Sequence, residues 1–363
     1  MATISQAQLD IYIYTGIAGE KPSTPQYTLV KDKLSSESII VFEVAELVKD
    51  YVDVNFTGDY QTISQNAWVD FVITRTFDDG SVDTTPIERR ALAFLGYGEF
   101  EDGINPALSK TFLASNTYFY VKKGERAYVP VYVSTDGVYQ VEYFEGSTSL
   151  VSYKIGGSVK KITTDTTDIK TDTTDFKTDI ISERTPDSVG FQRQTEVPLN
   201  SDKVTVTAPD GTTETRFIKN IEECKYTPQR VSFMNKFGVI QDLWFFKRRD
   251  DSFETERDDY KRSILEIGTS SVSYNTNKHS RQATDVRATE MLKMNTGFIT
   301  EDHNEVIKQL MVTEHCWVHN SDSTLTPLVP STTSFQEKKE VNEKLINFTV
   351  EFKVANNYIQ DIR

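Results

Sequence analysis

The stretch Leu345–Val354 alternates apolar and polar residues without a break, and it constrains the possible folds more than any other feature of the sequence. The apolar set comprises Ile346, Phe348, Val350, Phe352 and Val354, and the polar set comprises Asn347, Thr349, Glu351 and Lys353. A period of two places the sets on opposite faces of a β-strand. The segment therefore predicts a strand with one face in a core and the other toward water.

Shorter segments of the same kind recur along the chain. Trp68–Phe77 alternates, with Val69, Phe71 and Ile73 on the side expected to be buried, and it runs into the tight-turn signal Asp78-Asp79-Gly80. Further strands are expected at 9–14, 117–121, 127–133, 139–144, 150–155, 230–234 and 242–246, with a hairpin at 204–217. Helical spacing occurs at 43–52 and 301–314. The sequence predicts a mainly β protein, built from β-sandwich or barrel modules with a few short helices.

The length of 363 residues favours about two domains. We expect two β-rich domains in tandem: an acidic N-terminal domain over 1–155, and a β-sandwich-like domain over 191–363 flanked by the helix at 301–314. Between them, 156–190 contains a Thr/Asp-rich repeat of period seven, in which Ile169 and Phe176 are apolar. One apolar position per heptad does not support a coiled coil. This segment is therefore expected to be a connector or arm.

The charge of the chain limits its partners. There are 40 basic and 54 acidic side chains, a net charge of −14, and residues 1–155 hold 12 of the basic and 21 of the acidic ones. Proteins that grip nucleic acid by its phosphates are usually basic, so specific DNA binding is not expected. No apolar run approaches the ~18 residues of a membrane helix, so no membrane partner is expected either.

The uncharged composition favours β-sheet. Apolar residues make up 37% of the chain, against roughly 45–50% in an average globular domain. The 43 threonines replace part of this apolar content and are typical of strands.

No motif indicates catalysis, and we expect no enzyme, metal or cofactor. The sequence has no nucleophile elbow, phosphate-binding glycine loop or zinc-protease motif. Acid pairs such as Asp250/Asp251 and Asp258/Asp259 are expected in turns and charged loops. The group His303, His315, Cys316 and His319 has no recognised metal-site spacing, and we interpret it as a buried Cys and Trp in a strand with histidines at its rim.

The strands expected at 230–234 and 242–246 are joined by a turn at 235–238, and the second of them carries three consecutive aromatic residues. Two interpretations stand: a central strand covered on both faces, or a strand with one face against another subunit. In the second case the adjacent basic residues would pair with acids of a neighbour or contact phosphate. The subunit-interface candidates are Trp244, Phe245, Phe246, Lys247, Arg248 and Arg249, together with Ile169 and Phe176 of the connector.

Several segments between residues 226 and 363 carry a resemblance: Val231-Ser-Phe-Met-Asn-Lys-Phe-Gly, Leu243-Trp-Phe-Phe, Leu292-Lys-Met-Asn-Thr-Gly-Phe-Ile, the helix with Gln309-Leu-Met, Cys316-Trp-Val, Phe348–Ala355 and Ile359. In these segments the chain resembles a family of tailed-bacteriophage virion proteins of the tail or baseplate. Such a resemblance implies that the burial missing from the apolar-poor chain is completed between subunits. The resemblance implies a structural subunit of a ring or tube (tail, baseplate hub or neck), made in the host cytoplasm and located in the virion. Its partners would be further copies and other virion proteins. The acidic first domain would then line a channel through which DNA passes without specific binding.

Two alternatives lead to different functions. A host-attachment or carbohydrate-binding tail module would use exposed Tyr and Trp side chains beside Asp and Asn. A polysaccharide-degrading enzyme is the third class, but the sequence lacks the long β-helix repeat typical of such enzymes.

Overall fold

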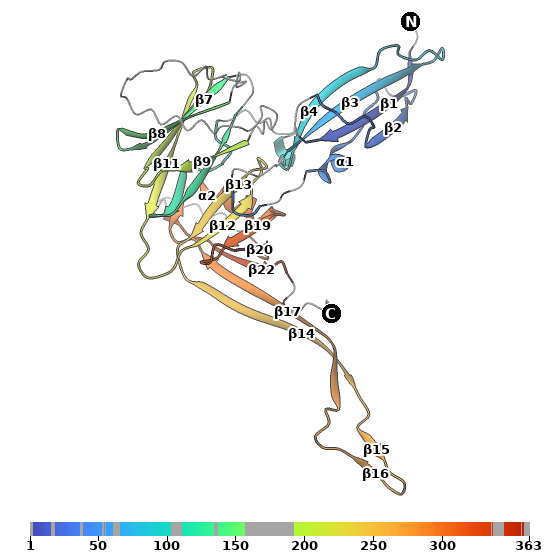
Figure 1. Ribbon diagram of the computed structural model, residues 1–363, viewed down its shortest axis with the longest axis vertical. Coiled ribbons are helices and arrows are strands. Elements are labelled where there is room, and N and C mark those ends of the chain that lie inside the picture. The colour runs from blue at the N-terminus through green and yellow to red at the C-terminus, as the bar shows by residue number, and fades with distance from the viewer. Residues whose placement is uncertain are drawn as a thin grey trace, which may run out of the picture. The chain divides into compact units, whose positions relative to one another are not determined.

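The computed structural model describes residues 3–15, 19–36, 39–52, 54, 56–60, 66–102, 111–133, 137–156, 192–334, 336, 345–356 and 358. Within this part of the chain strands predominate and there are two α-helices, which confirms the predicted mainly β fold (Figure 1). The chain divides into two compact units. The first comprises Met1–Ile221 and Met234–Asp242, and the second comprises Glu222–Phe233 and Leu243–Arg363.

The first unit contains a four-stranded antiparallel sheet of order β2-β1-β3-β4. The strands are β1 (Ile4–Tyr14), β2 (Tyr27–Asp32), β3 (Asn66–Phe77) and β4 (Ile87–Phe94). Buried residues of β1 and β3 pack with Val48 of helix α1 (Ala45–Lys49), which lies inside the predicted helical segment. Val69 is buried and Phe71 and Ile73 pack against the same core, as the alternation predicted. A short 3-10 helix, η1 (Phe100–Asp102), follows this sheet.

A second group of strands in this unit encloses another core. A five-stranded sheet of order β5-β11-β10-β7-β8 and a two-stranded sheet of β6 and β9 contribute its buried residues. Their bounds are β5 (Tyr118–Lys122), β6 (Ala127–Tyr132), β7 (Val138–Glu145), β8 (Thr148–Gly156), β9 (Gln192–Val197), β10 (Lys203–Thr207) and β11 (Thr213–Ile221). The fully buried Tyr143 of β7 lies 2.8 Å, hydroxyl to hydroxyl, from Thr195 of β9 and so joins the two sheets.

The observed partition differs from the predicted domain boundary at residue 190. Strand β10 pairs with β7, and β11 pairs in parallel with β5, so 192–221 complete a sheet begun by 118–156. The hairpin of β10 and β11 was itself predicted, but its partners are distant in sequence. Residues 157–191, which include Ile169 and Phe176 of the expected connector, lie outside the described residues.

The second unit is built on a seven-stranded sheet of order β13-β12-β19-β20-β22-β17-β14. Its strands are β12 (Gln229–Met234), β13 (Ile240–Phe245), β14 (Arg249–Lys261), β17 (Arg281–Asn295), β19 (Cys316–His319), β20 (Leu325–Pro330) and β22 (Thr349–Val354). Helix α2 (His303–Val312) lies within the predicted segment and buries Val306, Ile307 and Leu310.

The alternating C-terminal segment forms two strands of this unit. Strand β21 (Leu345–Ile346) pairs with β18 (Ile299–Thr300), whereas β22 joins the large sheet. Ile346, Phe348, Val350 and Phe352 are all buried. The predicted faces are therefore correct, although the strand is interrupted at 347–348.

The hairpin of β12 and β13 has its base in the second unit and its tip, Met234–Asp242, in the first. At the turn, the Asn235 side chain accepts a hydrogen bond from the Phe237 amide (3.0 Å) and donates one to the Leu113 carbonyl (2.7 Å). Gly238 adopts a positive φ of 68°, which favours glycine. A Cβ added at Gly238 would lie 2.3 Å from the Leu95 carbonyl oxygen, so the turn also requires a residue without a side chain.

Candidate assembly site

The most prominent surface feature of the second unit is a long β-ribbon, which we call the arm (residues 249–295). Strands β14 and β17 pair antiparallel along their length, and the short strands β15 (Leu265–Ile267) and β16 (Val272–Tyr274) form a hairpin at the far end (Figure 1). We call residues 261–281 the arm tip and the remainder the shaft. The prediction that Asp250, Asp251, Asp258 and Asp259 lie in turns or charged loops is wrong, because all four belong to β14.

The sequence did not reveal the arm because β14 is exposed on both faces, whereas β17 buries only Ala288, Leu292 and Met294 near its C-terminal end. In β14 every residue from Asp250 to Lys261 is exposed, so no buried face imposes an apolar stripe. The available signal was weaker: Phe253 and Thr255 alternate with acidic residues, a strand-like composition without a hydrophobic side.

Opposite charges face each other at two positions of the shaft. Asp250 lies opposite Lys293, and Glu256 lies opposite Arg287, which are favourable cross-strand pairs. The shaft nevertheless carries four basic and eight acidic residues, a net charge of −4. The shaft is therefore acidic.

The arm tip differs from the shaft in both polarity and charge. Leu265 is opposite Tyr274 and Ile267 is opposite Val272, so all four side chains share one face of the hairpin. Their exposed fractions are 62% for Leu265, 85% for Ile267, 65% for Val272 and 66% for Tyr274. The tip also carries four basic residues and one acidic residue, a net charge of +3. It therefore presents an apolar face in a basic setting.

The basic triplet predicted as an interface lies at the base of the arm and is paired with acids of its own chain. Lys247 Nζ lies 2.7 Å from Glu223 Oε2, and this ion pair lowers the pKa of the Glu223 carboxyl. Arg248 and Arg249 pair with Asp250 and Asp251 at 2.5 and 2.6 Å. The predicted pairing with acids of a neighbour or with phosphate stays a prediction.

The aromatic candidates Trp244, Phe245 and Phe246 are all buried. Trp244 stacks on Phe246 on one face of the strand, while Phe245 meets Phe352 edge-on on the other. The interpretation of a strand covered on both faces is confirmed, although β13 is an edge strand of the sheet and not a central one. The competing hypothesis, that one of these rings faces another subunit, is corrected by their burial.

The histidine and cysteine group lies on two elements, His303 on α2 and the others at or beside β19. Cys316 is buried in β19, as predicted, whereas Trp317, also predicted to be buried, is half-buried and stacks on His315. His319 bonds to the Ser232 hydroxyl at 2.7 Å. His303 is buried at the start of α2, beside Asp302. Among the described residues no three His, Cys, Asp or Glu side chains are grouped so as to hold a metal ion.

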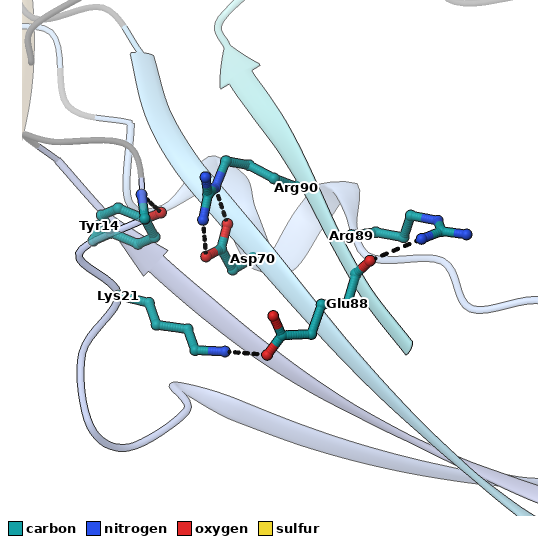
Figure 2. Close-up of polar contacts among 7 residues, drawn as sticks. Tyr14, Lys21, Asp70, Glu88, Arg89 and Arg90 are labelled. Carbon is teal, nitrogen blue, oxygen red and sulfur yellow. Dashed lines mark hydrogen bonds and ion pairs between the residues drawn. The ribbon is translucent and has the colours of Figure 1, made fainter. Parts of the chain in front are cut away.

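A group of polar side chains links β3, β4 and the segment that follows β1 (Figure 2). Asp70 of β3 accepts hydrogen bonds from Nε and Nη2 of Arg90 on β4, at 2.6 and 2.9 Å. The Arg90 guanidinium lowers the pKa of the Asp70 carboxyl. Beside this pair, Lys21 Nζ lies 2.8 Å from Glu88 Oε1. Because each of these four charges has a partner within the chain, we interpret the ion pairs as stabilising the sheet.

A groove lies beside the edge strand β2 of the same sheet. It has a volume of about 560 Å³ and is lined by Thr28, Leu29, Val30, Lys31, Val41, Phe42 and Glu43. We call it the β2 groove. Val30 and Val41 are 57% and 58% exposed within it, and Lys31 Nζ donates to the Val41 carbonyl (3.2 Å). The neighbouring loop also exposes Leu34 and Ile39. The β2 groove is thus a second exposed apolar surface.

No known protein family, curated protein or solved structure matches the chain. Among the described residues, no helix has the length and apolar character needed to cross a membrane.

Proposed function

We propose that this chain is a structural subunit that assembles with further copies through its arm, as part of a ring or tube in a tailed-phage virion. The observation that carries the assembly role is the arm tip, with four large apolar side chains exposed on one face of a two-stranded hairpin. Assembly would complete the burial that the apolar-poor composition leaves unfinished.

The physical argument is that such a tip needs a partner. A two-stranded hairpin alone is at best marginally stable in water. Contiguous exposed apolar residues on a polar surface mark interaction sites, and burying each side chain contributes roughly 1.5–3 kcal/mol. A partner that covers this face would therefore stabilise both the hairpin and the assembly.

The virion setting rests on the resemblance of residues 226–363 to tail and baseplate proteins, a segment that includes the whole arm. The acidity of residues 1–155 supports a channel that repels DNA. A cryo-EM reconstruction of the intact particle tests this setting, and absence of the chain from every ring and tube would contradict it.

The assembly role can be tested by shortening the arm. The amide of Arg262 donates to the carbonyl of Ser280 at 2.8 Å, so a two-residue Asn-Gly turn can replace residues 263–279 without changing the register of the shaft. We expect the full chain to form multimers at micromolar concentration by light scattering, and the shortened chain to remain monomeric with an unchanged circular dichroism spectrum.

A point substitution gives the matched control. Ile267→Asp in the tip should reduce assembly in the same way, whereas Val312→Asp, at another exposed apolar position of the second unit, should leave it unchanged. A monomeric full chain, or a shortened chain that assembles as well as the full one, would contradict the proposal.

A further inference from the structure

We infer that the arm tip of one copy docks in the β2 groove of a second copy. This inference rests on the proposed function and names the partner surface of the same site. Three observations on the chain support it: matching apolar surfaces, opposite charge and unpaired strand edges.

The apolar surfaces match in kind and exposure. The tip offers Leu265, Ile267, Val272 and Tyr274 on one face. The β2 groove offers the exposed Val30 and Val41, and the neighbouring loop adds Leu34 and Ile39, whereas Leu29 and Phe42 pack against the core of the sheet. Each surface is exposed in the single chain. Contact between them removes both from water at once.

The two regions carry opposite net charge. The tip carries +3, whereas residues 1–102 hold 7 basic and 17 acidic side chains, a net charge of −10. The charged residues that line the groove itself, Lys31 and Glu43, balance each other, so the acidity is that of the surrounding region. The shaft, at −4, would be repelled from the same region. Complementary potentials of this kind accelerate encounter and fix orientation, so the tip and not the shaft meets the groove.

The strand edges permit backbone pairing as well. Among the described residues, strand β2 is at the edge of its sheet and pairs with β1 alone. The hairpin of β15 and β16 is a sheet of two strands, and within the same part of the chain neither has a further strand beside it. An open edge is a template for a further strand. Docking can therefore add hydrogen bonds to the apolar contact.

This contact is heterologous, because the tip and the groove are different surfaces of one chain. Repetition of a heterologous contact generates a closed ring or an open helical fibre. The inference thus accounts for a ring or tube with one type of contact.

A disulfide experiment between two chains tests the contact. Both chains carry Cys224→Ser, which removes the exposed native thiol. One chain then carries Ile267→Cys and the other Val30→Cys, and both positions are exposed, so the substitutions should not disturb folding. After mild oxidation we expect a covalent dimer in the mixture and none with either chain alone.

Two mixtures provide matched controls. Val312→Cys with Val30→Cys replaces the tip by another exposed position of the second unit, and Ile267→Cys with Val138→Cys replaces the groove by another exposed position of the first. Neither should cross-link. Because the contact joins opposite charges, raising ionic strength from 0.05 to 0.5 M should weaken association about tenfold or more.

The outcomes separate this inference from the proposed function. If Ile267→Asp abolishes assembly but the tip and groove cysteines do not cross-link, the groove is the wrong partner and the assembly role stands. If the full chain never assembles, both fail. Cross-linking of both control mixtures to the same extent would also overturn the inference, because it would show collision without docking.

Discussion

Asp70 and Arg90 face each other across strands β3 and β4 and are joined by two parallel hydrogen bonds. Asp70 is buried on the face of the sheet that the alternating sequence predicted to be exposed to water. The pair is fork-shaped and charge-assisted, the strongest geometry for an arginine and a carboxylate. The pair therefore links β3 to β4 on the face of the sheet opposite to the buried Val69.

Removing the charge of Asp70 should weaken this connection. Asp70→Asn keeps the shape of the side chain, but the amide is uncharged and has one acceptor oxygen in place of two. We therefore expect the free energy of unfolding to fall by about 2 kcal/mol. Urea denaturation of the full chain measures it. Glu88→Gln, at the more exposed ion pair with Lys21, should have a much smaller effect. Equal losses in both variants would contradict a special role for Asp70.

The Asp70–Arg90 pair also predicts how the stability of the folded chain changes at low pH. Arg90 lowers the pKa of Asp70 in the folded chain. The stabilisation is therefore fully present above the pKa of an unfolded aspartate, about 3.9, and is lost as pH falls through the lower folded value. The difference in stability between wild type and Asp70→Asn should be constant from pH 7 to 5 and shrink toward pH 2.5. A difference that grows on acidification would contradict the assignment.

The turn at Gly238 should not tolerate a side chain. In Gly238→Ala the new Cβ would meet the Leu95 carbonyl in addition to the unfavourable positive φ. Gly211→Ala is the matched control, because Gly211 also has a positive φ but has no atom near its added Cβ. We expect about 1 kcal/mol lost at Gly211 and about 3 kcal/mol or more at Gly238. Thermal unfolding compares the two, and similar melting temperatures would be evidence against the close approach.

The two thiols should react very differently. Cys224 is exposed, whereas Cys316 is buried in β19, and burial raises the pKa of its thiol. At neutral pH a thiol reagent should modify one cysteine in the native chain and two in denaturant. Rapid modification of both thiols in native buffer would show that Cys316 is not buried in the folded chain.

The sequence predicted the elements that bury one face. The segments containing β1, β3, β12, β22 and α2 were located because a core imposes a period on each of them. The arm was missed for the opposite reason, since β14 is exposed on both of its faces and carries charges on both. The predicted boundary at residue 190 differed because β5 and β11 pair over about a hundred residues, and no local pattern encodes such a partner.

The candidate site was predicted only in part. The aromatic run at Trp244–Phe246 was identified as two-sided, but a sequence cannot distinguish cover by its own chain from cover by a neighbour. Lys247–Arg249 were predicted to pair with acids of a neighbour or to contact phosphate, and in the structure they pair with acids of their own chain. The β2 groove was not predicted, because it joins β2 to a segment without regular structure.

The placement of 234–242 in the first unit has a consequence for synthesis of the chain on the ribosome. When residue 221 has emerged, the first unit still lacks Asn235 and Gln241, which bond to the Leu113 carbonyl and the Asn116 side chain, and Phe237, which packs against Leu113. These residues lie at the tip of the hairpin of β12 and β13, whose base belongs to the second unit. Folding of the N-terminal half thus waits for translation to enter the C-terminal half, and a fragment ending at residue 221 would expose an unfilled core.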